Sequence, residues 1–116
     1  MINKESKQLK GILTISKKKI FIDIDGVITN ESYGFDYLNR TPNLETIKTI
    51  NRLYKKNYIV LYSARYKEDM DITINWMKKH KVSYHEIILG KPQYDYFIDD
   101  KAYNSFGDLN KKIKEI

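Results

Sequence analysis

The sequence has no cysteine, only two prolines, and no apolar run that could cross a bilayer. The absence of cysteine excludes disulfides and thiolate metal sites, and it fits the cytoplasmic location that we expect. The longest apolar runs, such as residues 58–62, are far shorter than the roughly 20 residues of a membrane span. No apolar segment follows the early lysines, so we expect neither a secretory signal nor a membrane partner.

The composition is that of an ordinary globular chain, with 116 residues, 41% hydrophobic and 31% charged. This length allows one domain with one modest core. Six lysines and one glutamate among residues 1–20 account for five of the six net positive charges. We therefore separate a basic leader, residues 1–18, from a main domain, residues 19–116. The leader is interpreted as a solvated segment, flexible or with an extra strand at residues 11–16. The alternative is an arm that attracts the phosphates of nucleic acid or of a membrane surface.

Strands and helices alternate along the main domain. Apolar runs predict strands at residues 20–25, 58–62, 84–89 and 94–98, and helical periodicity predicts helices at 42–56, 67–79 and 105–114. This order is typical of an α/β fold: a three-layer α/β/α sandwich whose mainly parallel sheet is covered on both faces. In such sheets a ligand binds outside the carboxyl ends of the strands.

Polar residues follow each predicted strand at that edge. They are Asp23, Asp25, Ser63, Lys91, Asp99 and Asp100. Phosphoryl transfer needs a nucleophile, groups that offset phosphate charge, and a proton donor for the leaving oxygen. Gly26 lets the backbone turn sharply after the first pair of aspartates. The spacing therefore predicts that these residues converge on a phosphate.

Several carboxylates in one small space repel each other unless they share a cation. Mg²⁺ suits such a site because it binds oxygen and combines a few carboxylates with substrate phosphate and water. Asp99 is the expected second carboxylate ligand, with Asp100 beside it. Ser63 can donate a hydrogen bond to a phosphoryl oxygen, and Lys91 supplies a positive charge that offsets the phosphate.

Four short motifs resemble those of the haloacid-dehalogenase-like (HAD) phosphatases. They are Phe21-Ile-Asp-Ile-Asp-Gly-Val-Ile-Thr29, Tyr62-Ser63, Gly90-Lys91-Pro92 and Ile98-Asp99-Asp100. Their order is that of the family, and together they cover about residues 20–104. The resemblance implies a magnesium-dependent phosphatase that forms an aspartyl-phosphate.

The resemblance also implies a role for each matched residue. Asp23 would be the nucleophile and a Mg²⁺ ligand, and Asp25 would be the general acid and then the general base, with its carbonyl on the metal. Ser63 and Lys91 would bind the phosphoryl group. Asp99 would ligate Mg²⁺, and Asp100 would ligate it through water or orient a ligand.

The loops between the motifs leave no room for a cap domain. The chain therefore resembles the capless subclass. The pattern Tyr62-Ser-Ala-Arg65, Tyr84-His85, Gly90-Lys-Pro-x-Tyr-Asp95 and Ile98-Asp-Asp-Lys-Ala102 is similar to small HAD proteins found with capsule and lipopolysaccharide biosynthesis enzymes. Selectivity would then come from a flap at residues 31–41, from the loop at Arg65 and Tyr66, or from a neighbouring subunit in a homo-oligomer. Arg65 is interpreted either as a substrate contact or as a surface residue.

Three functions stay open at this point. The first is hydrolysis of a small phosphorylated metabolite, such as a sugar phosphate of surface-polysaccharide synthesis. The second is a nucleotide or polynucleotide end phosphatase, suggested by the open site and the basic leader. The third is a non-catalytic phosphate-binding module.

Overall fold

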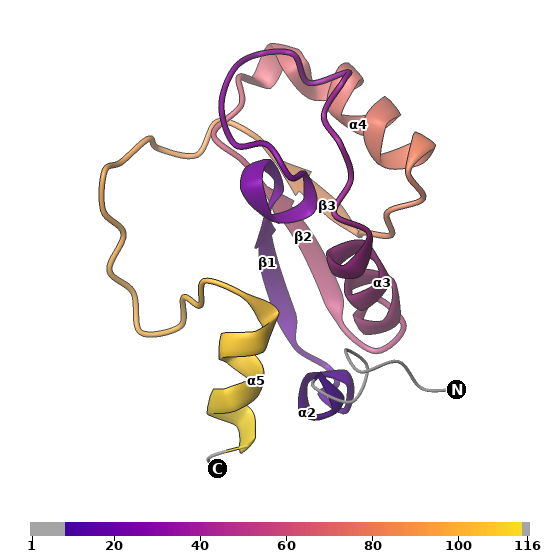
Figure 1. The fold of residues 1–116 in the computed structure, drawn as a ribbon, viewed down its shortest axis with the longest axis vertical. Coiled ribbons are helices and arrows are strands. Elements are labelled where there is room, and N and C mark those ends of the chain that lie inside the picture. Colours follow the sequence, from indigo (N-terminus) through magenta and orange to yellow (C-terminus); the bar gives the residue numbers. More distant parts are fainter. Residues whose placement is uncertain (1–8, 115–116) are drawn as a thin grey trace.

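Three parallel strands form the sheet of this protein in the computed structural model, which describes residues 9–114 (Figure 1). They are β1 (Lys19–Asp23), β2 (Tyr58–Tyr62) and β3 (Glu86–Ile88), in the order β1-β2-β3. The α-helices are α2 (Lys10–Leu13), α3 (Leu44–Leu53), α4 (Met70–Lys79) and α5 (Phe106–Lys114), and the short helical turns are η1 (Ile24–Ile28) and η2 (Lys67–Asp69). The prediction of an α/β fold with parallel strands is confirmed.

The register of the sheet separates a core face from a more exposed one. In the β1–β2 ladder Ile22 lies opposite Leu61, and both side chains are buried. Because side chains alternate along a strand, the neighbouring positions point to the other face. There Phe21 and Tyr58 are 51% and 43% exposed. Asp23 lies opposite Tyr62 at the carboxyl ends of both strands, which places the first candidate site residue at the expected edge.

Helices α3 and α4 connect the strands and bury their apolar sides. The Asn43 side chain accepts a hydrogen bond from the N–H of Thr46, which caps the first turn of α3 as its sequence predicts. Helix α4 buries Trp76 and Met77. Both crossovers step in the same direction across the sheet, so right-handed connections place α3 and α4 on the same face. Within residues 9–114, no helix is long and apolar enough to cross a membrane.

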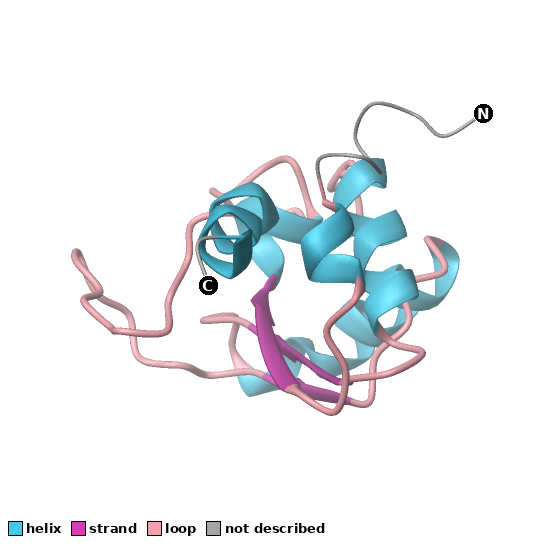
Figure 2. Cartoon of the chain, turned by 90° about the horizontal axis from the view of Figure 1, so that it is seen from below, coloured by secondary structure: helices cyan, strands magenta, loops and turns pink. Residues whose placement is uncertain are grey.

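The predicted fourth strand at residues 94–98 is not formed. The third strand is also shorter than predicted, with bounds Glu86–Ile88 instead of 84–89. The chain then leaves the sheet as an extended segment, here called the arm (residues 92–105), every residue of which is exposed. Figures 1 and 2 both show the arm projecting away from the strands and helices before it reaches α5. The apolar alternation of this segment predicted a strand, but it has no strand partner among the described residues.

The extra strand considered for residues 11–16 is also wrong, since residues 10–13 form α2. Ile12 is fully buried in the core, and its backbone N–H donates to Oδ1 of Asn110 on α5 at 2.7 Å. Gly11 allows this approach, because a Cβ at that position would lie 2.7 Å from the same oxygen. The end of the predicted leader is therefore part of the packed domain, while residues 1–8 lie outside the described part.

Replacing Ile12 with alanine tests whether α2 belongs to the core. We expect Ile12→Ala to lower the free energy of unfolding by about 3 kcal/mol, because it removes buried methyl groups and leaves a cavity. Urea unfolding would measure the loss, with Lys10→Ala on the exposed side of the same helix as control. Equal small effects of the two variants would show that α2 is not docked in solution.

Candidate active site

A pocket of about 240 Å³ lies at the carboxyl ends of β1 and β2. Its charged lining residues are Asp23, Asp25, Arg40, Arg65 and Lys91, and the flap adds aromatic side chains that include Phe35 and Tyr37. Concave sites with a few convergent charged groups are the usual places for ligands in α/β proteins. The structure thus brings two predicted aspartates, the predicted lysine and Arg65 to one pocket.

Asp23 is the last residue of β1 and faces Lys91. Its Oδ1 lies 3.2 Å from Nζ of Lys91 and also accepts a hydrogen bond from the N–H of Ile24. Burial raises the pKa of Asp23 above its ordinary value, while the Lys91 ammonium acts in the opposite direction. The carboxylate is 41% exposed, whereas Lys91 is only 11% exposed. The pair therefore presents an accessible carboxylate beside a fixed cation.

The backbone turns sharply after Asp23, as Gly26 predicted. Gly26 has φ of +86°, and a Cβ there would lie 3.0 Å from Cβ of Ser32. The N–H of Gly26 donates to the carbonyl of Glu31 and to Oγ1 of Thr29, and that hydroxyl itself donates to Glu31. The threonine of the first motif therefore holds the turn that presents Asp25 to the pocket.

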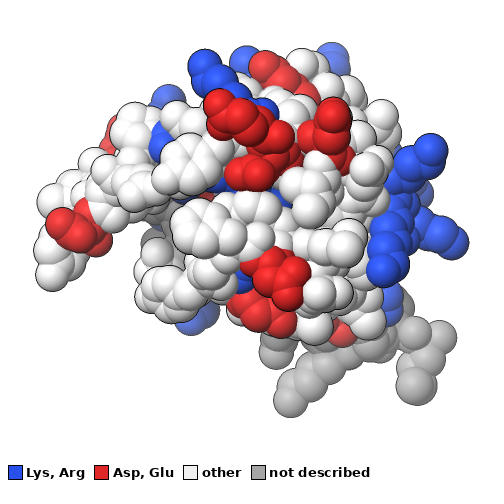
Figure 3. All heavy atoms as spheres, turned by 90° about the horizontal axis from the view of Figure 1, so that it is seen from above, with Lys and Arg blue, Asp and Glu red and all other residues white. Residues whose placement is uncertain are grey.

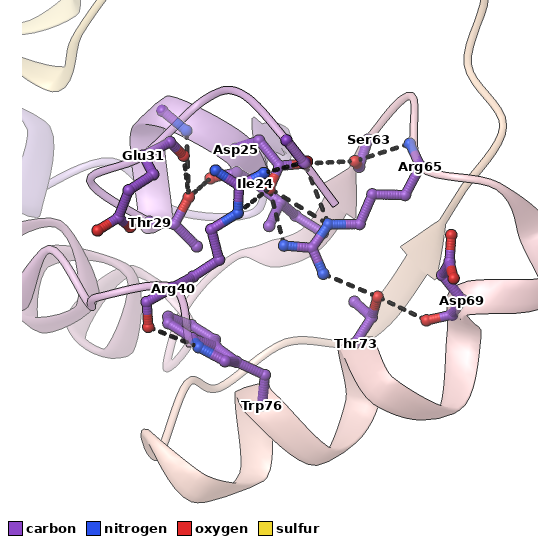
Figure 4. Close-up of polar contacts among 12 residues, drawn as sticks. Ile24, Asp25, Thr29, Glu31, Arg40, Ser63, Arg65, Asp69, Thr73 and Trp76 are labelled. Carbon is purple, nitrogen blue, oxygen red and sulfur yellow. Dashed lines mark hydrogen bonds and ion pairs between the residues drawn. The ribbon is translucent and has the colours of Figure 1, made fainter. Parts of the chain in front are cut away.

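Asp25 is held by Ser63 and Arg65, which follow β2. The Ser63 hydroxyl donates to Oδ2 of Asp25 at 3.0 Å. Arg65 donates from Nε at 3.0 Å to the same oxygen and from Nη2 at 2.7 Å to Oδ1 (Figure 4). Two-point contacts between arginine and a carboxylate fix orientation as well as charge. The predicted phosphate donor Ser63 is thus 1% exposed and bonded to the predicted general acid.

Arg65 is a buried anchor for Asp25, which neither sequence interpretation anticipated. It is 3% exposed, its Nη1 donates to Oγ1 of Thr73 on α4, and that hydroxyl donates to the carbonyl of Asp69. The ring of Tyr37 covers the guanidinium with 4.0 Å between the centroid and Cζ. This arginine therefore links the turn η1 after β1, the loop after β2, and α4.

Arg40, at the end of the flap, is a second buried arginine that sequence reasoning missed. Its Nη2 donates to the carbonyl of Gly34, its carbonyl accepts from the Trp76 indole, and its Nε lies 3.8 Å from Oδ1 of Asp25. Its Nε and Nη1 are buried and have no hydrogen-bond partner among residues 9–114. A single arginine in a polar loop carries no sequence pattern, so nothing in the sequence distinguished it.

The flap is closed at its base by contacts between its two ends. The N–H of Asn30 donates to the carbonyl of Thr41, and both Glu31 carboxylate oxygens accept from Thr41. These hydrogen bonds lower the pKa of Glu31. The flap tip carries Tyr33 and Phe35, which are 92% and 75% exposed.

Asp99 and Asp100 do not reach the pocket. Both lie exposed on the arm, and Oδ1 of Asp99 accepts a hydrogen bond from the N–H of Lys101. Among residues 9–114 no group of three or more acidic, histidine or cysteine side chains could hold a metal ion. The two pocket aspartates already face Lys91 and Arg65. The metal site therefore stays a prediction, and of its predicted ligands Asp23 and Asp25 are the two that lie at the pocket.

A crystal structure of an MCSG target from Vibrio cholerae is similar to this chain. The two share 30% sequence identity with a TM-score of 0.70, over 84% of this chain and 94% of that one. The chain belongs to the same family as that Vibrio protein, whose name states no activity. No protein-family model and no curated protein matches the chain. The comparison thus supports the α/β fold and indicates no reaction.

Asp23→Asn is expected to stabilise the protein near neutral pH. Burial raises the pKa of Asp23 in the folded state, so its contribution to stability is fully present below the unfolded pKa and is lost as the pH rises through the folded pKa. Asparagine stays neutral throughout. The stability gain should therefore be larger at pH 7 than at pH 3, as measured by urea unfolding at both values. Asp71→Asn, at an exposed position on α4, controls for the loss of one negative charge. A gain that does not depend on pH would contradict this account.

Arg65→Gln should lower the free energy of unfolding by about 3 kcal/mol, because it leaves Asp25 and Thr73 without their buried partner. Lys78→Gln, at an exposed position on α4, removes the same charge and should change stability by no more than about 0.5 kcal/mol. Chemical denaturation of both variants at neutral pH gives the comparison. If the two losses were equal, Arg65 would not anchor Asp25.

Proposed function

We propose that this protein is a phosphomonoester hydrolase that acts through an aspartyl-phosphate on Asp23. The contact between Asp23 and Lys91 at the pocket carries this proposal. Within residues 9–114, Oδ2 of Asp23 accepts no hydrogen bond, while Oδ1 is held by Lys91 and the N–H of Ile24. An oriented, partly exposed carboxylate beside a cation can attack an anionic phosphate, because the cation offsets the charge of the incoming group.

In the first step Oδ2 of Asp23 forms a bond to phosphorus as the bond to the leaving oxygen breaks. The electron pair of the broken bond stays on the leaving oxygen, which takes a proton from Asp25; to act as general acid, Asp25 enters this step in its protonated form. Lys91 stays close to the phosphoryl oxygens. Because Asp25 is bonded to Arg65 and Ser63, its carboxyl group must exchange one of these hydrogen bonds for the leaving oxygen.

In the second step water attacks the phosphorus of the aspartyl-phosphate. Asp25 takes a proton from that water as general base, and the bond between phosphorus and Asp23 breaks with its electron pair returning to the carboxylate. The products are inorganic phosphate and the original enzyme. Arg65 and Arg40 both approach Oδ1 of Asp25, so Oδ2, the oxygen bonded to Ser63, is the one that can turn to the leaving oxygen or to water.

The proposed function includes the features that the HAD resemblance implies for the metal and for the layers of the fold. These include Mg²⁺, which when bound neutralises phosphate charge, and a three-layer α/β/α sandwich. Helices α3 and α4 would form one layer, and α5, which packs against α2, would form the other. The cytoplasmic location likewise stays a prediction from the sequence.

The substrate class that we propose is a small phosphorylated metabolite such as a sugar phosphate. The pocket is small, and acidic and uncharged side chains cover the centre of the face shown in Figure 3. On that face, lysine and arginine side chains of the described residues gather toward the edges and do not form a continuous basic track across its centre. A polynucleotide would need such a track along its phosphates.

Asp23→Asn should abolish phosphate release, with a loss of roughly 10³-fold or more, because an amide cannot act as the nucleophile. Asp71→Asn should keep the wild-type rate. The measurement is release of phosphate from a panel of sugar phosphates and from p-nitrophenyl phosphate, with added Mg²⁺. With p-nitrophenyl phosphate, whose leaving group needs no proton, Asp25→Asn should trap phosphate on Asp23, seen as one added phosphoryl group in an acid-quenched mass spectrum.

Three other results of these assays would contradict the proposed function or favour one of its alternatives. Undiminished turnover by Asp23→Asn would end the proposal. Phosphate binding without turnover by any substrate would favour a non-catalytic binding module. Release from 3′-phosphorylated oligonucleotides and not from sugar phosphates would favour the polynucleotide alternative.

A further inference from the structure

The arm carries exposed apolar side chains that no other segment of the described chain covers. Its residues are exposed throughout, and Tyr96 and Ile98 are 90% and 99% exposed. The rings of Tyr94 and Phe97 contact each other, but both side chains remain more than half exposed. A run of aromatic and aliphatic side chains held in solvent marks an interaction surface.

The arm has the side-chain pattern of an amphipathic strand. Tyr94, Tyr96 and Ile98 alternate with Asp95, Phe97 and Asp99. An edge strand has unpaired backbone groups that can pair with an amphipathic segment of this kind from another chain. Strand β1 is an edge strand, since the described sheet has the order β1-β2-β3.

If residues 94–98 pair in parallel with β1, one register places the apolar side chains of both strands on the same faces of the sheet. If Asp99 lies opposite Asp23, then Ile98 lies opposite Ile22 on the core face. Phe97 then lies opposite the half-exposed Phe21, and Asp95 opposite the exposed Lys19. A shift by one residue would turn every side chain to the wrong face. The same register that pairs apolar with apolar residues also brings the missing carboxylate to the pocket.

The arm of the same chain cannot reach this position. The N–H of Lys91 donates to the carbonyl of Ser63, just beyond the carboxyl end of β2. In the register above, Tyr94 would lie opposite Lys18, about 16 Å back along β1 from Asp23. The three residues from Lys91 to Tyr94 span at most about 11 Å. In the structure the Tyr94 ring is instead 5.6 Å from Nζ of Lys91.

We propose that two copies of this chain exchange arms, so that residues 94–98 of each pair in parallel with β1 of the other. Each pocket then receives Asp99 and Asp100 from the second copy, and these complete the oxygen donor set that one chain lacks. The part of this inference that concerns Asp99 rests on the proposed function; the exchange of arms does not. A two-fold dimer of this kind is closed, because both arms are used.

The molecular mass in solution is the first test. Sedimentation should give a dimer for the wild type and a monomer for Tyr96→Asp, which places a charge on the side of the arm that faces the core. Tyr33→Asp is the matched control, because Tyr33 on the flap is 92% exposed and Tyr96 is 90% exposed. It should remain a dimer. A wild-type monomer at working concentration, or dissociation by both variants alike, would overturn the exchange.

Cysteine cross-linking tests the pairing without reference to activity. The chain has no cysteine, so Phe21→Cys and Phe97→Cys can be introduced without background. The double variant, treated with a short thiol cross-linker, should run as a covalent dimer on a denaturing gel. A link within one chain, or a dimer formed equally well by either single variant, would reject the proposed register.

Complementation connects the exchange to the pocket. Asp23→Asn and Asp99→Asn should each be inactive, but unfolding them together and refolding the equal mixture should restore about a quarter of the wild-type rate, since half of the dimers contain one intact pocket. No recovery would show that Asp99 acts within its own chain or not at all. If the wild type itself released no phosphate, the proposed function would fail, and mass and cross-linking would still decide the exchange.

Discussion

The ion pair between Asp25 and Arg65 is the contact on which the rest of the site depends. It joins the turn after β1 to the loop after β2, and through Thr73 it reaches α4. Both partners are largely buried, so the removal of either would leave a charge without compensation. Asp23 ends β1 and Asp25 lies two residues later in the turn η1, so tertiary contacts, and not the backbone alone, fix the position of Asp25 relative to Asp23. The site is consequently as rigid as the packing between the sheet and α4.

Asp23 is subject to two opposing influences. Partial burial disfavours its negative charge, whereas Lys91 favours it. In the proposed reaction both influences are useful, since the carboxylate must be ionised to attack but must not be so strongly stabilised that it loses its nucleophilic character. Lys91 follows Gly90, whose φ of +77° turns the chain back toward β1 after β3. The turn at Gly90 thus places Lys91 within reach of the Asp23 carboxylate.

Local patterns were sufficient to predict much of this structure. Strand β2 and helices α3 and α5 were predicted to within a few residues, because short apolar runs and helical periodicity are bounded by Asn, Gly and Ser. The meeting of Asp23, Asp25, Ser63 and Lys91 followed from strand ends that share one edge. The anchoring role of Arg65 and the burial of Arg40 could not be predicted, because they depend on distances between segments far apart in sequence. The strand expected at residues 94–98 has the right alternation, but whether a strand forms depends on a pairing partner that the pattern cannot specify.

The base of the flap has a consequence for how this fold could diversify. Glu31 and Thr41 tie the two ends of the loop together, and Thr29 separately fixes the turn that carries Asp25. Residues between these ties can therefore be exchanged, lengthened or shortened without altering the reacting groups. Related proteins can therefore differ in substrate specificity through the flap while they keep the same reacting groups at the strand ends.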